Sequence, residues 1–287
     1  MRALRRQHGC VCVAQFDGAC VDTRVYATHL RAPFDAHIAV SEYTAQELRG
    51  ALHDRAPWFI RTCPMGVDAD GFSPGRRSEA VREGLLRRVG GSAHTRLLFY
   101  AGRLSPEKNI GLLLDTMRIL ASDRSADYRL IVAGEGPVAG RLGNSVDRIW
   151  LCGNLAKDTL ADYLATCDVF VHPNPREPFG IGPLEAMASG VPVVVPNAGG
   201  VLEYASRDNA WLAAPGAASF AAAIRAAAHG DPARIAAASE TIMRFHWREA
   251  TRRYFDAYDD IHRRFTRAAS RGVSFQTRAR GVVDALE

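Results

Sequence analysis

The chain alternates between short apolar runs and segments whose apolar residues recur every three or four positions. Five of the runs show no polar alternation, which is typical of strands covered on both faces in a parallel sheet. They are LLFYAG, YRLIVAG, IWLCG, VFVHP and VPVVV. The intervening segments with helical spacing are IGLLLDTMRILAS, TLADYLATC and PLEAMAS. Strand, helix and strand repeated in this way predict an α/β fold with a doubly wound parallel sheet.

The first 90 residues follow this pattern less regularly. We expect strands in VCVAQF, in HIAVSE and over residues 58–62, and a helix in EYTAQELRGAL that is capped by Ser41. The loop GVDADGF is then expected to lead from a first domain into a second. A polar helix over residues 78–88 and the Gly90-Gly91 break precede the regular alternation.

Helices are also expected after the last strand. Residues 217–240 are rich in alanine, with isoleucines at helical intervals, and predict outer helices. Residues 245–247 and the following segment EATRRYFDAYDDI predict an amphipathic helix whose apolar face is formed by Trp247, Tyr254, Phe255 and Tyr258. From about residue 267 the chain is arginine-rich without periodicity. This predicts a flexible tail, with weak attachment to an acidic membrane surface as the alternative.

Composition narrows the class of protein. With 287 residues and 47% hydrophobic content, the chain can form one large or two modest domains. Its net charge of +5 comes from arginine spread along the sequence, which allows an anionic ligand, and no nucleic-acid motif accompanies it. No apolar run approaches the span of a bilayer and no cleavable signal is expected, so the predicted location is the cytoplasm, with its membrane face as the alternative.

The six cysteines show no zinc-binding spacing. We expect them to be small buried side chains in a reducing compartment, with metal binding by the pair Cys10 and Cys12 as the alternative. A second metal candidate is the D-x-D pair Asp68 and Asp70, which lies in a turn.

The segment between VFVHP and VPVVVP carries the first candidate chemistry. Gly180 and Gly182 allow close approach of the backbone to a ligand, Pro183 suits the first helical position, and Gly190 is the expected left-handed end of the helix. A glycine-rich turn that leads into a helix N-terminus presents unpaired N–H groups and the positive end of the helix dipole. The segment therefore predicts a phosphate-binding site.

Two glutamates bracket this phosphate-binding segment. Glu177 precedes Pro178, and Glu185 follows eight positions after Glu177. Because carboxylates accept hydrogen bonds, the pair suits a ligand that has hydroxyls as well as phosphates, namely a nucleotide sugar. The alternative is that Glu185 only complements the helix dipole and that Glu177 is a solvated loop residue.

Two further loops follow predicted strands. In GRLSPEKN, the planar guanidinium of Arg103 and the mobile charge of Lys108 together suit a diphosphate, with solvated surface charge as the alternative. In GEGP, the third glycine of a dinucleotide-binding G-x-G-x-x-G is one position late, at Gly140. A dehydrogenase or a nucleotide-sugar epimerase is therefore not favoured, and the chain also lacks a Tyr-x-x-x-Lys pair in such a context.

The string EPFGIGPLEAMASGVPVV resembles the E-x7-E region of the retaining GT4-like (group 1) glycosyltransferases. GRLSPEKN is similar to the GRL-x-x-EKG segment of that family, and GVDADGF to its PNGVD-x-x-F loop. The turn from Asn197 to Glu203 is similar to its G-G-x-x-E turn. Asn109 replaces the glycine that is commoner in the family, a mild departure because asparagine tolerates turn geometry.

This resemblance implies a GT-B fold, in which two Rossmann-like domains face each other. The expected domains are a partial N-terminal, acceptor-side domain (1–75), a complete C-terminal donor-binding domain (76–245), a crossover helix that packs back on the first domain (246–266) and the basic tail (267–287). What precedes Ser41 is shorter than a complete N-terminal domain of the family. Neither His8 nor His29 matches the family's histidine near the reacting sugar, so no catalytic histidine is assigned.

The resemblance further implies transfer of a hexose, with retention, from a UDP- or GDP-hexose to a hydroxyl of a glycan, lipid or small molecule, without a metal cofactor. The implied catalytic residues are Glu177, Arg103 and Lys108. The implied donor-binding residues are Gly102, Arg103, Lys108, Gly134, Gly136, Asn154, Leu155, Glu177, Phe179, Gly180, Ile181, Gly182, Leu184 and Glu185. The alternative is a truncated or non-catalytic donor-binding fragment that needs an N-terminal half or a partner chain.

Overall fold

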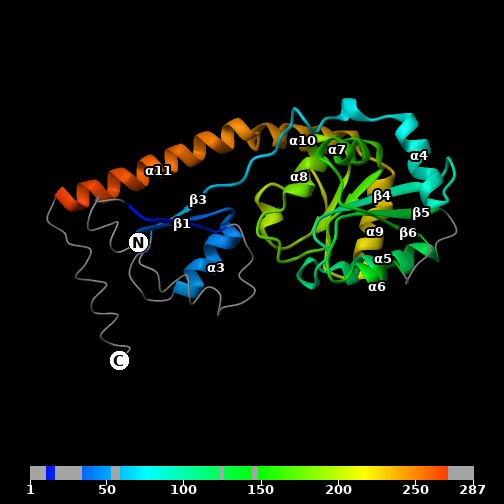
Figure 1. Ribbon diagram of the computed structural model, residues 1–287, viewed down its shortest axis with the longest axis horizontal. Coiled ribbons are helices and arrows are strands. Elements are labelled where there is room, and N and C mark those ends of the chain that lie inside the picture. Colours follow the sequence, from blue (N-terminus) through cyan, green and yellow to red (C-terminus); the bar gives the residue numbers. More distant parts are fainter. Residues whose placement is uncertain (1–10, 17–33, 53–58, 123–125, 144–147, 271–287) are drawn as a thin grey trace. The chain divides into compact units, whose positions relative to one another are not determined.

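The computed structural model describes residues 11–16, 34–52, 59–122, 126–143 and 148–270 (Figure 1). The tail beyond residue 270 lies outside these residues, as do Cys10, His8 and His29. The chain divides into two compact units, one formed by Met1–Met65 with Arg248–Glu287 and the other by Gly66–Trp247. Their roles as acceptor-side and donor-side domains stay a prediction.

A six-stranded parallel sheet forms the centre of the second unit. Its strands are β4 (Arg96–Ala101), β5 (Tyr128–Ala133), β6 (Ile149–Gly153), β7 (Val169–Val171), β8 (Val193–Pro196) and β9 (Trp211–Ala213). The strand order is β6-β5-β4-β7-β8-β9, and all the pairs are parallel. This topology confirms the doubly wound sheet, to which the unpredicted β9 adds one edge strand.

Helices cover both faces of this sheet, as Figure 1 shows. On one face lie α5 (Ile110–Ala121), α6 (Ala139–Gly143) and α9 (Ala217–Ala228). On the other lie α4 (Glu79–Val89), α7 (Lys157–Thr166), α8 (Ile181–Ala188) and α10 (Pro232–Arg244). Three short 3-10 helices are η1 (Pro74–Arg76), η2 (Pro106–Lys108) and η3 (Gly200–Glu203).

The strands are apolar throughout because both of their faces are covered. In β4, the successive residues from Leu97 to Tyr100 are all at most 1% exposed. Leu98 and Tyr100 belong to the core under α5 and α9, whereas the ring of Phe99 packs on Phe170. Each such side chain contributes about 1.5–3 kcal/mol by its burial.

The order of the strands determines where a ligand can bind. From β4 the sheet grows outward through β5 and β6 on one side and through β7, β8 and β9 on the other. The switch point therefore lies between the carboxyl ends of β4 and β7, which is where open α/β sheets bind ligands. The loops after these two strands carry Arg103, Lys108 and Glu177.

The first unit is built on a smaller parallel sheet. Its strands are β1 (Val13–Phe16), β2 (Ala36–Ala39) and β3 (Phe59–Thr62), paired in the order β1-β2-β3. Helix α3 (Glu42–Leu52) follows β2, and the backbone N–H of Thr44 donates to Ser41 Oγ at 3.1 Å. This hydrogen bond confirms the predicted cap.

The long helix α11 (Trp247–Ser270) corrects the predicted apolar face. Tyr254, Ala257, Ile261 and Phe265 pack in one cluster with residues of the small sheet and Cys63. Phe255 is 67% exposed, and Trp247 and Tyr258 are also exposed. The inward residues follow a spacing of three and four, and Phe255 lies about 100° around the helix from Tyr254. The aromatic residues of α11 therefore do not by themselves define its buried face.

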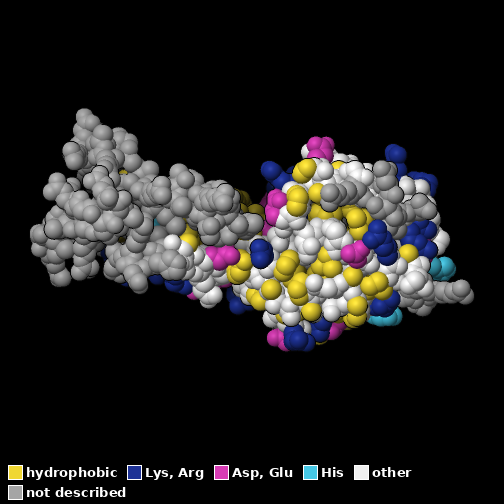
Figure 2. All heavy atoms as spheres, turned by 90° about the horizontal axis from the view of Figure 1, so that it is seen from below, with side chains coloured by type: hydrophobic (Ala, Val, Ile, Leu, Met, Phe, Trp, Pro, Cys, Tyr) yellow, Lys and Arg dark blue, Asp and Glu magenta, His cyan; other side chains and the backbone are white. Residues whose placement is uncertain are grey.

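Charged side chains are mixed with apolar ones on the face of the second unit shown in Figure 2. This mixing fits a net charge that is spread along the sequence. None of the described helices has a run that is long and apolar enough to cross a bilayer.

Gly134 makes a backbone contact that a side chain would break. A Cβ atom at residue 134 would lie 2.0 Å from the carbonyl oxygen of Gly102, and Gly134 has a φ of 129°. We expect Gly134→Ala to lower the free energy of unfolding by about 3 kcal/mol, because backbone atoms must move to accept the methyl group.

Chemical denaturation monitored by circular dichroism measures this change. Gly111→Ala is the matched control, because a Cβ there meets no atom within 4 Å and residue 111 lies inside α5. It should raise stability by about 0.5–1 kcal/mol. Equal stability of the Gly134→Ala variant and the native chain would contradict the packing of these two loops.

Candidate functional site

Helix α8 begins at Ile181, two residues before the predicted start at Pro183. Gly180 is its N-cap with a φ of 86°, a conformation that favours glycine, and no side chain caps the helix. Pro183 has no N–H, so the donors at this end that precede the intrahelical hydrogen bonds belong to Gly180, Ile181 and Gly182. The left-handed Gly190 ends the helix as predicted.

The loop after β4 is fixed between the loops that follow β5 and β7. The N–H of Leu104 donates to the carbonyl of Glu135 at 2.8 Å, and a Cβ at Gly136 would lie 2.2 Å from the carbonyl oxygen of Leu104. On the other side, Asn109 Nδ2 donates to the carbonyl of Pro173 at 3.0 Å. Asn109 has a φ of 55°, which confirms that asparagine serves in this turn.

Lys108 and Glu177, two of the predicted catalytic residues, form an ion pair at this junction. Lys108 Nζ donates to Glu177 Oε2 at 2.8 Å and to Oε1 at 3.1 Å. Glu177 is 7% exposed, so the alternative of a solvated loop residue is wrong. The structure thus brings a cation and a carboxylate from two loops to the switch point of the sheet.

Two residues that the sequence analysis missed also contact Glu177. Asn174 Nδ2 donates to Oε2 at 3.0 Å, and His172 Nε2 lies 3.4 Å from the same oxygen, a long contact for a hydrogen bond. Both side chains are buried. The available signal was the pair of polar residues in HPN, directly after the buried strand β7.

Glu177 is ionised at neutral pH. Burial by itself raises the pKa of this carboxyl, but the contact with His172 and the ammonium of Lys108 outweigh burial and lower the pKa to about 2. His172 and Lys108 therefore keep the carboxyl of Glu177 ionised.

Glu185 has the opposite environment. It lies half-buried on α8, and no hydrogen bond to its carboxyl is found in the described part of the chain. Burial raises its pKa to about 7; the negative Asp68 adds to this rise, and Lys157 partly offsets it. This carboxyl therefore titrates near neutral pH and has free hydrogen-bonding capacity.

Arg103 is exposed on the loop after β4. Its backbone carbonyl accepts a hydrogen bond from the hydroxyl of Tyr100 at 3.2 Å, which fixes the main chain beside Gly102. In the described part of the chain, no ion pair engages its guanidinium. Arg103 thus has a backbone that is held in place and a guanidinium that is available to a ligand.

The other predicted binding residues differ in what they can offer. Phe179 and Leu184 are buried, and the ring of Phe179 packs on Tyr204, with 5.4 Å between the ring centroids. They can reach a ligand through their backbones alone. Asn154 is exposed and Leu155 half-buried after β6.

The two aspartates of the D-x-D pair have separate partners. Asp68 pairs with Lys157 and accepts a hydrogen bond from the N–H of Gly71 at 3.0 Å. Asp70 lies 3.5 Å from His246. Within the ranges that the structure describes, no group of three or more His, Cys, Asp or Glu residues could hold a metal ion.

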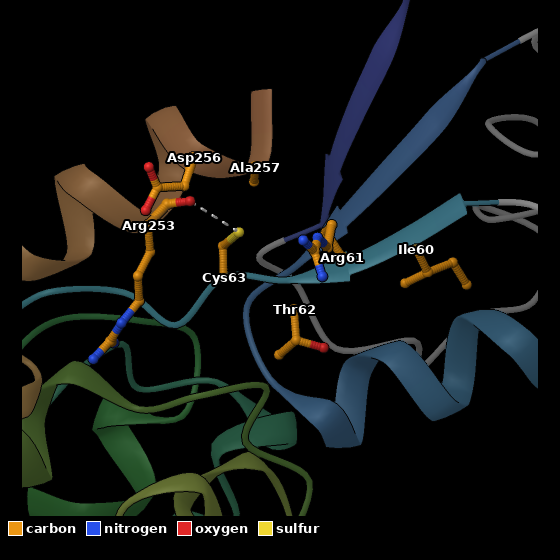
Figure 3. Close-up of a pocket in the computed structure, with 7 residues that line it drawn as sticks. All are labelled: Ile60, Arg61, Thr62, Cys63, Arg253, Asp256 and Ala257. Carbon is orange, nitrogen blue, oxygen red and sulfur yellow. Dashed lines mark hydrogen bonds between the residues drawn. The ribbon is translucent and has the colours of Figure 1, made fainter. Parts of the chain in front are cut away.

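A pocket of about 370 Å³ lies in the first unit (Figure 3). It is lined by β3 residues, by Cys63 and by Arg253, Asp256 and Ala257 of α11. Cys63 Sγ lies 4.0 Å from the carbonyl oxygen of Arg253. None of the predicted donor-binding residues lines this pocket.

Solved structures share the fold of the chain. Sucrose-phosphate synthase from Thermosynechococcus elongatus aligns with a TM-score of 0.73 and 22% identity over 91% of this chain and 70% of that one. Anabaena Alr3699/HepE, solved in complex with UDP and glucose, aligns with a TM-score of 0.72 and 21% identity over 87% and 72%. The class of fold is GT-B, as expected.

Sequence relatives identify the family. Residues 95–229 match the family model described as glycosyl transferases group 1. The GDP-mannose-dependent alpha-(1-6)-phosphatidylinositol dimannoside mannosyltransferase of Mycobacterium tuberculosis is 35% identical over 52% of this chain and 38% of its own length. The sulfoquinovosyl transferase SQD2 of Arabidopsis thaliana is 31% identical over 67% and 38%. The chain contains a domain of the GT4-like group 1 glycosyltransferases over residues 95–229. It spans about two fifths of the length of these curated relatives.

The raised pKa of Glu185 makes stability depend on pH. A carboxyl whose folded pKa of about 7 exceeds its unfolded value of 4.5 contributes stability that is full below pH 4.5 and is lost as the pH rises through 7. Glu185→Gln removes this loss. We expect the stability of the variant relative to the native chain to rise by about 2 kcal/mol between pH 5 and pH 8.

Denaturant unfolding at a series of pH values measures the difference. Glu83→Gln, on the exposed surface of α4, controls for the loss of one negative charge. A difference between Glu185→Gln and the native chain that stays constant with pH would contradict the environment described for Glu185.

Proposed function

We propose that the second unit binds a nucleotide diphosphate hexose and that the protein transfers the hexose, with retention, to an acceptor hydroxyl. The observation that carries this proposal is the convergence at the switch point between β4 and β7. Lys108 and the N–H groups at the start of α8 are two sources of positive potential beside the buried carboxylate of Glu177, and Arg103 adds an exposed cation on the same loop as Lys108. Phosphates and hydroxyls on one ligand need this combination.

Each group has a role in the proposed reaction. Departure of the nucleoside diphosphate leaves an oxocarbenium-like sugar, so stabilisation of charge on the leaving phosphate is the largest requirement. Arg103, Lys108 and the backbone donors of α8 supply it. Glu177 accepts hydrogen bonds from sugar hydroxyls next to the anomeric carbon, and Glu185 accepts them from the ribose. The leaving phosphate oxygen takes the proton of the acceptor.

The names of relatives favour one donor among the candidates. Several of the matching proteins are described as GDP-mannose-dependent mannosyltransferases, whereas a structural neighbour was solved with UDP-glucose. We therefore propose GDP-mannose first and UDP-glucose second. The acceptor is a hydroxyl compound of the glycan, lipid or small-molecule class.

Calorimetric titration of the purified chain with GDP, UDP and ADP tests the donor site. We expect one nucleotide to bind, and Arg103→Ala to weaken its binding about tenfold or more through loss of a charge-assisted hydrogen bond. Arg118→Ala, on the exposed surface of α5, is the control and should bind like the native chain. If none of the three nucleotides binds, the proposal fails for the chain on its own.

Turnover tests the catalytic assignment. With the nucleotide sugar that matches the bound nucleotide, Arg103→Ala and Glu177→Ala should each lower kcat/KM by roughly 10², the scale of one preorganised contact with the transition state. Transfer or hydrolysis of a radiolabelled hexose provides the measurement, with Glu83→Ala as the surface control. Native turnover in both site variants would overturn the assignment.

A further inference from the structure

The two carboxylate oxygens of Glu177 are engaged unequally. Oε2 accepts hydrogen bonds from Lys108 and Asn174 and lies in contact with His172. In the described part of the chain, Oε1 accepts one hydrogen bond, from Lys108 at 3.1 Å. Lys108 therefore bridges both oxygens, whereas the other two groups hold only Oε2.

The inference that follows rests on the proposed function. In that function Lys108 has two anionic partners, Glu177 and the donor diphosphate. A donor diphosphate draws the ammonium toward its own oxygens, which carry more charge than a carboxylate. Glu177 then loses its bidentate partner while it stays buried. A buried carboxylate without partners is unfavourable, so other groups must hold it in place and ionised.

We propose that His172 and Asn174 are positioning residues that anchor Oε2 of Glu177. They keep the carboxylate in place when Lys108 turns to the diphosphate, and they leave Oε1 free to accept a hydrogen bond from a hydroxyl of the transferred sugar. The two residues act through Glu177 and touch neither the nucleotide nor the diphosphate.

The anchor is itself rigidly held. The backbone N–H of His172 donates to the carbonyl of Val194 at 2.9 Å, which extends the ladder between β7 and β8. Asn174 Oδ1 accepts a hydrogen bond from the N–H of Arg176 at 3.0 Å, so the amide Nδ2 must face Glu177. The hydrogen bond from Asn109 to Pro173 fixes the backbone between the two residues. None of these contacts involves Lys108, so its departure leaves them intact.

The anchored carboxylate lies against the start of α8. A Cβ at Gly180 would lie 3.1 Å from Glu177 Cγ, and the N–H of Gly200 donates to the carbonyl of Glu177 at 2.6 Å. The carboxylate thus lies next to the backbone donors proposed for the phosphate, and a sugar linked to that phosphate lies within reach of Oε1. This placement separates the groups that hold phosphate from the group that holds sugar.

Because different groups are proposed to hold the phosphate and the sugar, the experiment compares the binding of a nucleotide with that of its nucleotide sugar. Dissociation constants are measured for nucleotide and nucleotide sugar in pairs, GDP with GDP-mannose and UDP with UDP-glucose, on the native chain and on His172→Phe, His172→Gln and Asn174→Ala. Phenylalanine fills the volume without a polar atom, whereas the amide of glutamine offers a polar N–H group toward Oε2 in place of His172 Nε2. His94→Phe, at an exposed site before β4, is the matched control.

We expect His172→Phe and Asn174→Ala to weaken the nucleotide sugar about tenfold relative to the free nucleotide, the scale of a hydrogen bond to a charged group. Binding of the free nucleotide should stay within about twofold, and His172→Gln should restore most of the loss. Asn174→Ala keeps the test usable if His172→Phe does not fold.

Equal weakening of both ligands in His172→Phe and Asn174→Ala would overturn the anchor, because it would show general damage to the site. Unchanged binding of both ligands would overturn it as well. If the native chain binds neither member of either pair, the proposed function itself fails. That result differs from a failure of the anchor, in which native binding is present.

Discussion

The ion pair between Lys108 and Glu177 is the interaction on which the candidate site of the second unit depends. It joins the loop after β4 to the loop after β7, the two strands that diverge at the switch point. A carboxylate as buried as that of Glu177 is stable only if further donors satisfy it, and Asn174 supplies one. The sheet topology therefore brings the charges together, and the neighbouring polar groups allow them to stay.

The environments of the two glutamates differ in a way that suits two tasks. Glu177 is surrounded by donors, which keep its pKa low and its charge permanent. Glu185 is partly desolvated and lies near both Asp68 and Lys157, so its protonation responds to small changes around it. Two carboxylates separated by eight positions in the sequence thus differ strongly in pKa, because Glu177 has gained donors that outweigh its burial, whereas for Glu185 burial outweighs the attraction of Lys157.

The sequence predicted the sheet well, because burial on both faces leaves runs such as LLFYAG without polar alternation, and it also placed Lys108 and Glu177 in loops that follow predicted strands. It did not predict β9, whose residues WLA lack the β-branched side chains that mark the equally short VFV of β7. It placed Phe255 on the buried face of α11 because Tyr254 and Phe255 are equally aromatic, and only the sheet decides which of them faces inward. The contact of His172 with Glu177 depends on tertiary packing that spacing alone does not encode.

The close packing of main chain on main chain limits how this site can change in evolution. Gly134 approaches the carbonyl oxygen of Gly102, and Gly136 that of Leu104, at distances that exclude any side chain. Mutation at these positions offers no gradual route to a new ligand, because even the smallest replacement displaces a neighbouring loop. Variation around the site must therefore arise where side chains are exposed, as at Asn154 after β6, because the close contacts of Gly134 and Gly136 leave no room for one.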